Sequence, residues 1–237
     1  MSLRGLVISV AGTALVSPSW AVAAGPAEFA FRWEVVKGGP ASASEVATAL
    51  QLQPGKAKAY RVLYFDVTQP GQVPTGYKAL GRERGPSGGK PAATYKVRGA
   101  EPIPTELQNW KCPLVGPSES KAEVDIGFQG LSQVKRVFSV SCTVKEKGLK
   151  ASLPTGYGAT TKGCTSAMKR TKAQSETLEV KVEIWSLPKG RVVIEVSMEG
   201  ADSTEDFERF RDKVVKPLLD RKAVPLEASK TEVGSDC

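Results

Sequence analysis

The feature that most limits how this chain can fold is a repeated alternation of apolar and polar residues with a period of two. Successive side chains of a β-strand point to opposite faces of a sheet, so this period predicts strands with one apolar and one polar face. The alternation occupies eight segments, at residues 28–36, 59–67, 77–85, 93–99, 122–130, 135–146, 178–187 and 191–200. Turns rich in Gly and Pro separate them. The chain is therefore expected to be mainly β, with antiparallel strands.

Two further segments have the spacing of helices. Residues 42–52 begin with Ser42 or Ser44, and serine is a favourable N-cap residue. Residues 202–220 open with hydroxyl and acidic side chains and then place an apolar stripe on one side, formed by Phe207, Phe210, Val214 and Leu218. A short helix is also predicted at 166–171, inside a segment without a clear period. The expected fold class is α+β, with a few helices flanking the strands.

The first 24 residues have the layout of a secretory signal peptide. Arg4 precedes an apolar run from Leu6 to Val16, and small residues follow at Ala21 and Ala23. The apolar run is too short to span a bilayer, so stable membrane insertion is not expected. We predict a signal peptide at 1–24 and one domain at 25–237. The protein would then be exported, to a periplasmic or extracellular location.

The cysteines support the same expectation. The chain has an even number, four, at positions Cys112, Cys142, Cys164 and Cys237. In an exported protein such a set predicts two disulfide bonds, and three pairings are compatible with the sequence. A zinc site would need closely spaced cysteines or histidine ligands, and the sequence has neither.

The chain contains no histidine, which removes several classes of catalytic site. Ser-His-Asp and Cys-His nucleophiles are excluded, as are the common transition-metal sites. Any metal would have oxygen ligands, which suits magnesium, manganese or calcium. Acid–base chemistry would depend on Asp, Glu, Lys or Tyr. The formal net charge of +8 favours anionic partners.

Basic side chains gather on one face of two consecutive predicted strands. Lys78, Arg82 and Arg84 share a face in the first, and Lys96 and Arg98 share a face in the second. If the sheet has one solvated face, these cations are ordinary surface. If eight strands close into a barrel, the cations point inward, where there is room for a small ligand. Nucleic acid is not expected as a partner, since the cations lie beside acids and aromatic residues do not alternate with them.

Several motifs resemble the CYTH, or triphosphate tunnel, superfamily over residues 28–231. The stretch Tyr64–Val67, YFDV, is similar to the Y-F-D-T at the end of that family's second strand. Arg82 and Arg84 resemble its R-x-R pair, Lys96 its next inward lysine, and Ser229–Thr231 its terminal S-K motif. The resemblance implies an eight-stranded antiparallel tunnel-like barrel. It also implies binding, and hydrolysis, of triphosphate or polyphosphate compounds with a divalent metal.

Carried onto this sequence, the resemblance implies two sets of site residues. The implied substrate-binding cations are Lys78, Arg82, Arg84, Lys96, Arg98, Arg136 (or its neighbour Lys135) and Lys230. The implied ligands of magnesium or manganese are Glu34, Glu183, Glu195 and Glu199, with Asp125 in reserve; Glu34 and Glu195 would be catalytic.

The acidic half of the family pattern is incomplete in this chain. The family's first strand reads E-x-E-x-K, whereas residues 32–37 keep only Glu34 and Lys37, and Ser197 follows Glu195 where a second acid is expected. A missing carboxylate removes a metal ligand. Three hypotheses therefore stand: a metal-dependent phosphohydrolase, a non-catalytic protein that binds an anionic small molecule, and a structural barrel stapled by disulfides.

Overall fold

A computed structural model describes residues 25–71, 73–108 and 110–235. Ten strands form one sheet: β1 (Pro26–Glu34), β2 (Gln53–Pro54), β3 (Lys58–Thr68), β4 (Tyr77–Pro86), β5 (Ala92–Gly99), β6 (Ser118–Phe128), β7 (Val134–Val144), β8 (Gly158–Gln174), β9 (Glu179–Ser186) and β10 (Val192–Ala201). The α-helices are α1 (Ala43–Ala49), α2 (Thr105–Gln108), α3 (Leu149–Ser152), α4 (Thr204–Phe210), α5 (Lys216–Asp220) and α6 (Lys230–Ser235). The mainly β prediction is confirmed.

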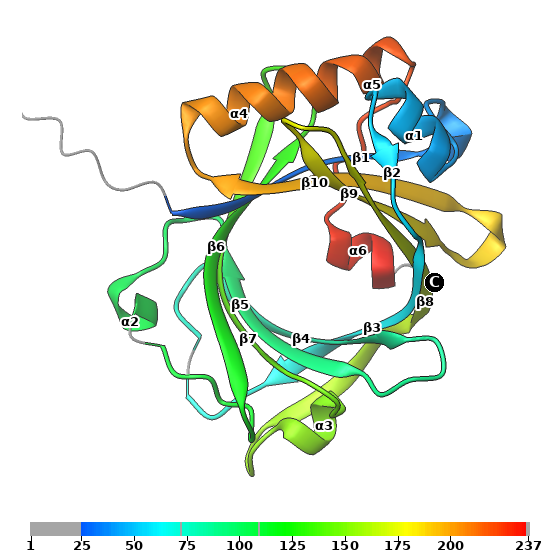
Figure 1. The fold of residues 1–237 in the computed structure, drawn as a ribbon. Coiled ribbons are helices and arrows are strands. Elements are labelled where there is room, and N and C mark those ends of the chain that lie inside the picture. The colour runs from blue at the N-terminus through cyan, green and yellow to red at the C-terminus, as the bar shows by residue number, and fades with distance from the viewer. Residues whose placement is uncertain (1–24, 72, 109, 236–237) are drawn as a thin grey trace, which may run out of the picture.

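The sheet closes on itself as a barrel (Figure 1). Nine strands follow one another in the order β8-β3-β4-β5-β7-β6-β1-β10-β9, and pairing of β8 with β9 completes the ring. The short β2 is bonded only to β8. The predicted count of eight strands is thus one too low. All the pairings are antiparallel except that of β1 with β6, which is parallel.

The additional strand is β8, in the segment to which the sequence assigned a short helix at 166–171. That prediction is wrong. Residues 158–174 form one 17-residue strand that is hydrogen-bonded to β3 on one side and to β9 on the other. A register shift between Val62 and Tyr64 of β3 interrupts the first pairing. The local sequence is polar with weak alternation, so its strand conformation depends on these two neighbours rather than on its own pattern.

Apolar side chains cover the outside of the barrel in two clusters. The larger lies under the helices of residues 204–220 and α1, and it includes Phe29, Phe31 and Trp33 of β1. Phe210 of α4 packs on Phe29 and Phe128, with ring centroids 5.9 and 5.3 Å apart. The helix predicted from the apolar stripe at 202–220 is confirmed, with a π-helical turn at 211–215 between α4 and α5.

The predicted helix starts agree with the capping chemistry. Ser42 accepts a hydrogen bond from the backbone N–H of Glu45 at the start of α1. Ser203 accepts one from Asp206 at the start of α4. In both cases a serine hydroxyl satisfies an N–H group that has no partner within the helix.

The second outer cluster lies under the segment that joins β5 to β6. Tyr95 and Val140 are buried there, and Tyr95 stacks on Trp110 with ring centroids 5.9 Å apart. A disulfide bond between Cys112 and Cys142 fastens this segment to β7. Cys164 of β8 is also disulfide-bonded, and Cys237, the fourth cysteine, lies outside the described residues.

The C-terminal segment passes into the barrel, and α6 lies within the ring of strands (Figure 1). The backbone N–H of Leu226 donates to the carbonyl of Arg32, 2.8 Å away. Val233 of α6 is buried in an inner apolar cluster with Tyr64 and Trp185. No helical pattern was recognised in this segment, although Ser229 and Glu232 form a capping box at its start.

Among the described residues, no helix is long and apolar enough to cross a membrane. The predicted signal peptide, residues 1–24, lies outside the part of the chain that the structure describes.

Candidate functional site

Closure of the barrel turns the polar face of its strands inward. The alternate, apolar residues of the same strands fill the two outer clusters. Solvent reaches part of this interior, because the side chains of Arg32 and Asp125 keep exposed fractions of 14% and 29%. Strand pairing and α6 place the following charged residues on the inner side: Glu28, Arg32, Glu34, Lys78, Arg82, Arg84, Lys96, Arg98, Glu123, Asp125, Arg170, Lys181, Glu183, Glu195, Glu199 and Lys230.

The basic residues of β4 and β5 form one wall of this interior. In the antiparallel register Lys78 lies opposite Arg98, Leu80 opposite Lys96, and Arg82 opposite Thr94. Arg82 donates to the Thr94 hydroxyl at 3.3 Å. Hydroxyls of β5 and β7 extend this polar surface, with the Thr94 and Thr143 oxygens 3.0 Å apart. The alternation in the sequence puts these cations on one face, and closure of the barrel points that face inward.

Arg82, Arg84 and Arg98, the cationic wall, form no ion pair with a carboxylate of any residue the structure describes. The Arg84 guanidinium lies over the ring of Tyr60, 5.8 Å from its centroid. Burial and the neighbouring Arg82 and Arg170 lower the pKa of Arg84 to about 10. An anion placed beside these guanidinium groups would relieve their mutual repulsion.

A second group, the central ion network, consists of Glu195 of β10 and Glu183 of β9 with the basic residues Arg32, Arg170 and Lys230. Glu195 contacts the guanidinium of Arg32 and the ammonium of Lys230, the latter at 2.7 Å. Glu183 accepts a hydrogen bond from Nε of Arg170 at 2.8 Å. Burial opposes ionisation of Glu183, but Lys230 and Arg170 outweigh it and hold its pKa at about 2. The pKa of the Lys230 ammonium is raised above its usual value. Burial opposes this shift, but the carboxylates of Glu183, Glu195 and Glu28 overcome it.

A third group is an acidic cluster of Glu28, Glu123 and Asp125. One oxygen from each of these residues lies within 4.8 Å of the others. Lys96 neutralises part of this charge, with Nζ 3.1 Å from Glu123 and 3.5 Å from Asp125. Burial raises the pKa of Asp125, whereas Lys96 and Lys121 overcome burial at Glu123 and lower its pKa.

The acids that the resemblance implied as metal ligands are not gathered at one point. Glu34 accepts a hydrogen bond from Arg191 at 2.7 Å, and Glu199 is ion-paired with Lys181. Glu183 and Glu195 belong to the central ion network. No three of these four residues bring one oxygen each within 4.8 Å of the others, so this set does not fit a divalent metal. The acidic cluster fits better, since three carboxylate oxygens suit a hard cation.

One implied substrate-binding residue lies on the wrong side of the sheet. Arg136 pairs with Ile126 in register, and both point to the outer face of the barrel. Its guanidinium contacts Asp202 at 2.6 Å. Alternation makes the neighbouring residue the inward one, so Lys135, the other basic residue considered, is the inward member of the pair.

Sequence reasoning missed part of the site, and strand parity could have found some of it. Glu28, Ala30 and Arg32 are the inward residues of β1. Strand parity alone puts Glu28 and Arg32 on the same face as Glu34, the acid of this strand that the sequence pointed to. Glu123 and Arg170 were also missed, the second because its segment was not assigned to a strand.

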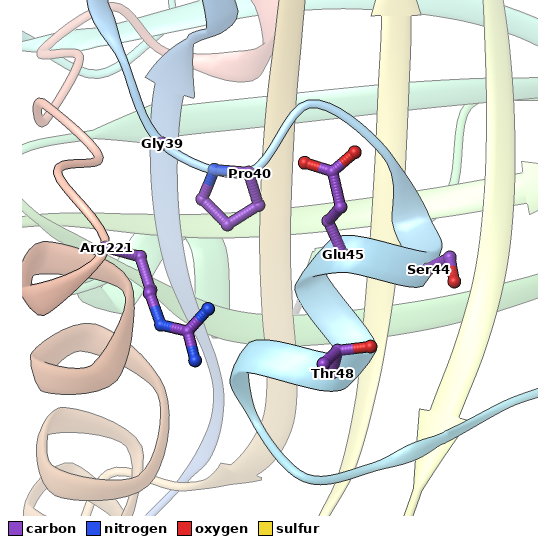
Figure 2. A pocket seen from close by; sticks show the side chains of 6 residues that line it. All are labelled: Gly39, Pro40, Ser44, Glu45, Thr48 and Arg221. Atoms are coloured by element: carbon purple, nitrogen blue, oxygen red, sulfur yellow. The ribbon is translucent and has the colours of Figure 1, made fainter.

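A surface pocket of about 290 Å³ lies outside the barrel, between the start of α1 and Arg221 (Figure 2). Its lining residues are Gly39, Pro40, Ser44, Glu45, Thr48 and Arg221. The carboxylate of Glu45 already accepts the backbone N–H of Ala41 at 3.0 Å, as part of the helix start. None of the interior charges described above lines this pocket.

Comparison with known proteins gives only distant likenesses. No protein-family model matches the chain, and no curated protein matches it. Among solved structures it is similar to PH1012 of Pyrococcus horikoshii OT3, at 12% identity and a TM-score of 0.46, covering 87% of this chain and 98% of that one. It is also similar to a Vibrio parahaemolyticus protein named "putative adenylate cyclase", at 13% identity and a TM-score of 0.47, covering 87% and 96%. At these scores the likenesses carry no argument, and the barrel rests on the strand pairings themselves.

Proposed function

We propose that the protein binds a triphosphate or polyphosphate compound inside the barrel, against the cationic wall of Arg82, Arg84 and Arg98. The proposal rests on a difference in pairing between the acidic and the basic side chains of the interior. The inward acids described above are in contact with basic side chains or lie in the acidic cluster beside Lys96, whereas these three arginines have no carboxylate partner among the described residues.

The chemistry of the wall suits phosphate groups. A guanidinium presents a planar fork of donors that matches two phosphate oxygens, and charge-assisted hydrogen bonds of this kind are stronger than neutral ones. The hydroxyls of Thr94 and Thr143 lie beside Arg82 and would donate to the same anion. Several cations in line would match a chain of phosphates better than a single phosphate. The resemblance to the CYTH superfamily supports the same class of ligand.

Hydrolysis of the bound compound is the second candidate function, and the acidic cluster favours it. Glu28, Glu123 and Asp125 would hold a magnesium or manganese ion. Such an ion, when bound, offsets charge on phosphoryl oxygens and orients water. Lys96, which now contacts two of these acids, would turn toward the anion. We further propose that the protein is exported, periplasmic or extracellular, which the Cys112–Cys142 disulfide supports.

Calorimetric titration with tripolyphosphate tests the binding proposal. Wild type should bind in the presence of a chelator, and Arg82→Ala and Arg84→Ala should each weaken binding about tenfold, the loss of one charge-assisted contact. Arg136→Ala is the matched control, because Arg136 points outward, and it should bind like wild type. Wild-type affinity in both inward variants would refute the proposal.

Phosphate release from tripolyphosphate then separates the two candidate functions. Release with magnesium or manganese, absent with chelator and lost in Asp125→Asn, would establish a hydrolase. Binding without release under all three conditions would establish a binding protein.

A further inference from the structure

The ammonium of Lys230 lies where carboxylates from three strands converge. Its Nζ is 2.7 Å from Glu195, 3.5 Å from Glu28 and 3.7 Å from Glu183. These residues belong to β10, β1 and β9, which are adjacent in the barrel. Glu183 and Glu195 are almost wholly buried, each with an exposed side-chain fraction of 1%. A single positive group therefore holds together acids that would otherwise repel each other.

The C-terminal segment delivers this ammonium from inside the barrel. Ser229 begins α6 with a capping box, and its hydroxyl accepts the N–H of Glu232 at 3.3 Å. At the other end, the hydroxyl of Ser166 donates to the carbonyl of Gly234 at 2.6 Å. Val233 is buried in the inner apolar cluster. Lys230 is thus fixed by packing on both sides, and it is not a mobile surface lysine.

The charges at this point balance without a metal. Glu28, Glu183 and Glu195 are in contact with Lys230. Glu195 also contacts Arg32, and Glu183 also contacts Arg170. Three acids therefore face three cations. A divalent ion added to this group would create an excess of two positive charges in a largely buried site, which is unfavourable unless Lys230 leaves.

We infer that Lys230 is a built-in cation that takes the place of a divalent metal between Glu28, Glu183 and Glu195. The acidic cluster shares Glu28 with this group, so Glu183 and Glu195 are the acids that distinguish the two. Removal of the ammonium should expose three carboxylates suited to a hard divalent cation. If Lys230 takes the place of the metal, tripolyphosphate should bind without a metal ion. This consequence rests on the proposed function.

Manganese binding tests the inference directly, by electron paramagnetic resonance and calorimetry of the purified protein. Lys230→Met should bind one Mn²⁺ per chain more than wild type. The double variant Lys230→Met/Glu195→Gln should lose that ion. Lys216→Met is the matched control, since Lys216 pairs with Asp220 on the surface, and it should bind Mn²⁺ like wild type.

Thermal unfolding gives a second readout of the same variants. Lys230→Met should have a lower Tm than wild type, because its three acids lose their shared cation, and Mn²⁺ should raise the Tm of this variant more than that of wild type. Lys230→Arg keeps the charge and should show neither effect. It is the control that separates loss of the charge from a general loss of fold.

Two results would overturn the inference: equal Mn²⁺ binding by wild type and folded Lys230→Met, or a wild-type Mn²⁺ ion that Glu195→Gln removes. An ion held by the acidic cluster is distinguishable, because Glu123→Gln removes it and Glu195→Gln does not. Failure of wild type to bind tripolyphosphate would refute the proposed function and leave the Mn²⁺ comparison intact.

Discussion

At the scale of single residues, the most deeply buried acids of the barrel interior form specific ion pairs, whereas the cationic wall has no carboxylate partner among the described residues. Burying a charge requires a partner, because desolvation costs several kcal/mol per ion. Arg32 illustrates the rule, since its guanidinium contacts Glu195, whose side chain is 1% exposed. Loss of one charged residue of such a pair therefore leaves its partner buried without a counter-charge, which lowers the stability of the fold.

Removing one member of such a pair should be costly. Arg32→Met would leave Glu195 with Lys230 as its remaining contact, and we expect the free energy of unfolding to fall by about 3–5 kcal/mol in urea. Arg211→Met is the control, since Arg211 pairs with Asp212 on the surface, and it should change stability far less. Equal effects in the two variants would mean that the interior pair is not effectively buried.

The pH dependence of stability follows from the same pairs. Glu183 has a pKa of about 2 in the folded protein against an ordinary value of 4.5, so its ionised form stabilises the fold. That contribution is complete above pH 4.5 and should be lost as the pH falls toward 2. Asp125 acts in the opposite direction, because burial raises its pKa.

The test compares how the free energy of unfolding depends on pH in wild type and in Glu183→Gln. Glu183→Gln should be less stable than wild type at pH 7, and its free energy of unfolding should fall less steeply between pH 5 and pH 2. Parallel curves for the two proteins would show that Glu183 does not contribute to the acid response.

At the scale of elements, α6 combines a charged and an apolar role. It carries Lys230 toward the acids, and its end packs against the aromatic rings of the inner cluster. Gly234 lies at a close contact, because a Cβ there would come within 2.4 Å of Tyr64 and 2.9 Å of Trp185. The close approach of helix and strands therefore depends on the absence of a side chain.

Gly234→Val should consequently destabilise the protein by about 1–3 kcal/mol through overpacking. Gly130→Val is the control, since a Cβ at Gly130 meets nothing within 4 Å. Chemical denaturation of the two variants provides the comparison. An unaffected Gly234→Val protein would mean that α6 does not pack inside the barrel as described.

At the scale of the whole molecule, a disulfide stabilises the fold by joining the segment between β5 and β6 to β7. Cys112 and Cys142 are 30 residues apart, so the bond closes a loop of moderate length. Loss of the bond restores freedom to the unfolded chain. We expect Cys112→Ala/Cys142→Ala to lower the free energy of unfolding by about 2–4 kcal/mol. An unchanged unfolding midpoint would contradict a stabilising bond in solution.

The sequence by itself determined eight of the strands and the two faces of each. Lys78, Arg82 and Arg84 alternate with apolar residues, and Phe29, Phe31 and Trp33 alternate with polar ones, because side-chain direction in a strand is a local property of period two. Local rules also located the two main helices. They failed at 158–174, where the strand is held by its neighbours on both sides.

Only the tertiary structure decided what the polar faces do. Closure through β8 and β9 turns them inward, and the parallel register of β1 and β6 places Glu28 beside Asp125. Entry of the C-terminal segment brings Lys230 to Glu195 across 35 positions of sequence. Each of these contacts joins residues far apart along the chain, so no local pattern specifies it. These contacts form because the closed arrangement buries the apolar faces and pairs most of the buried charges.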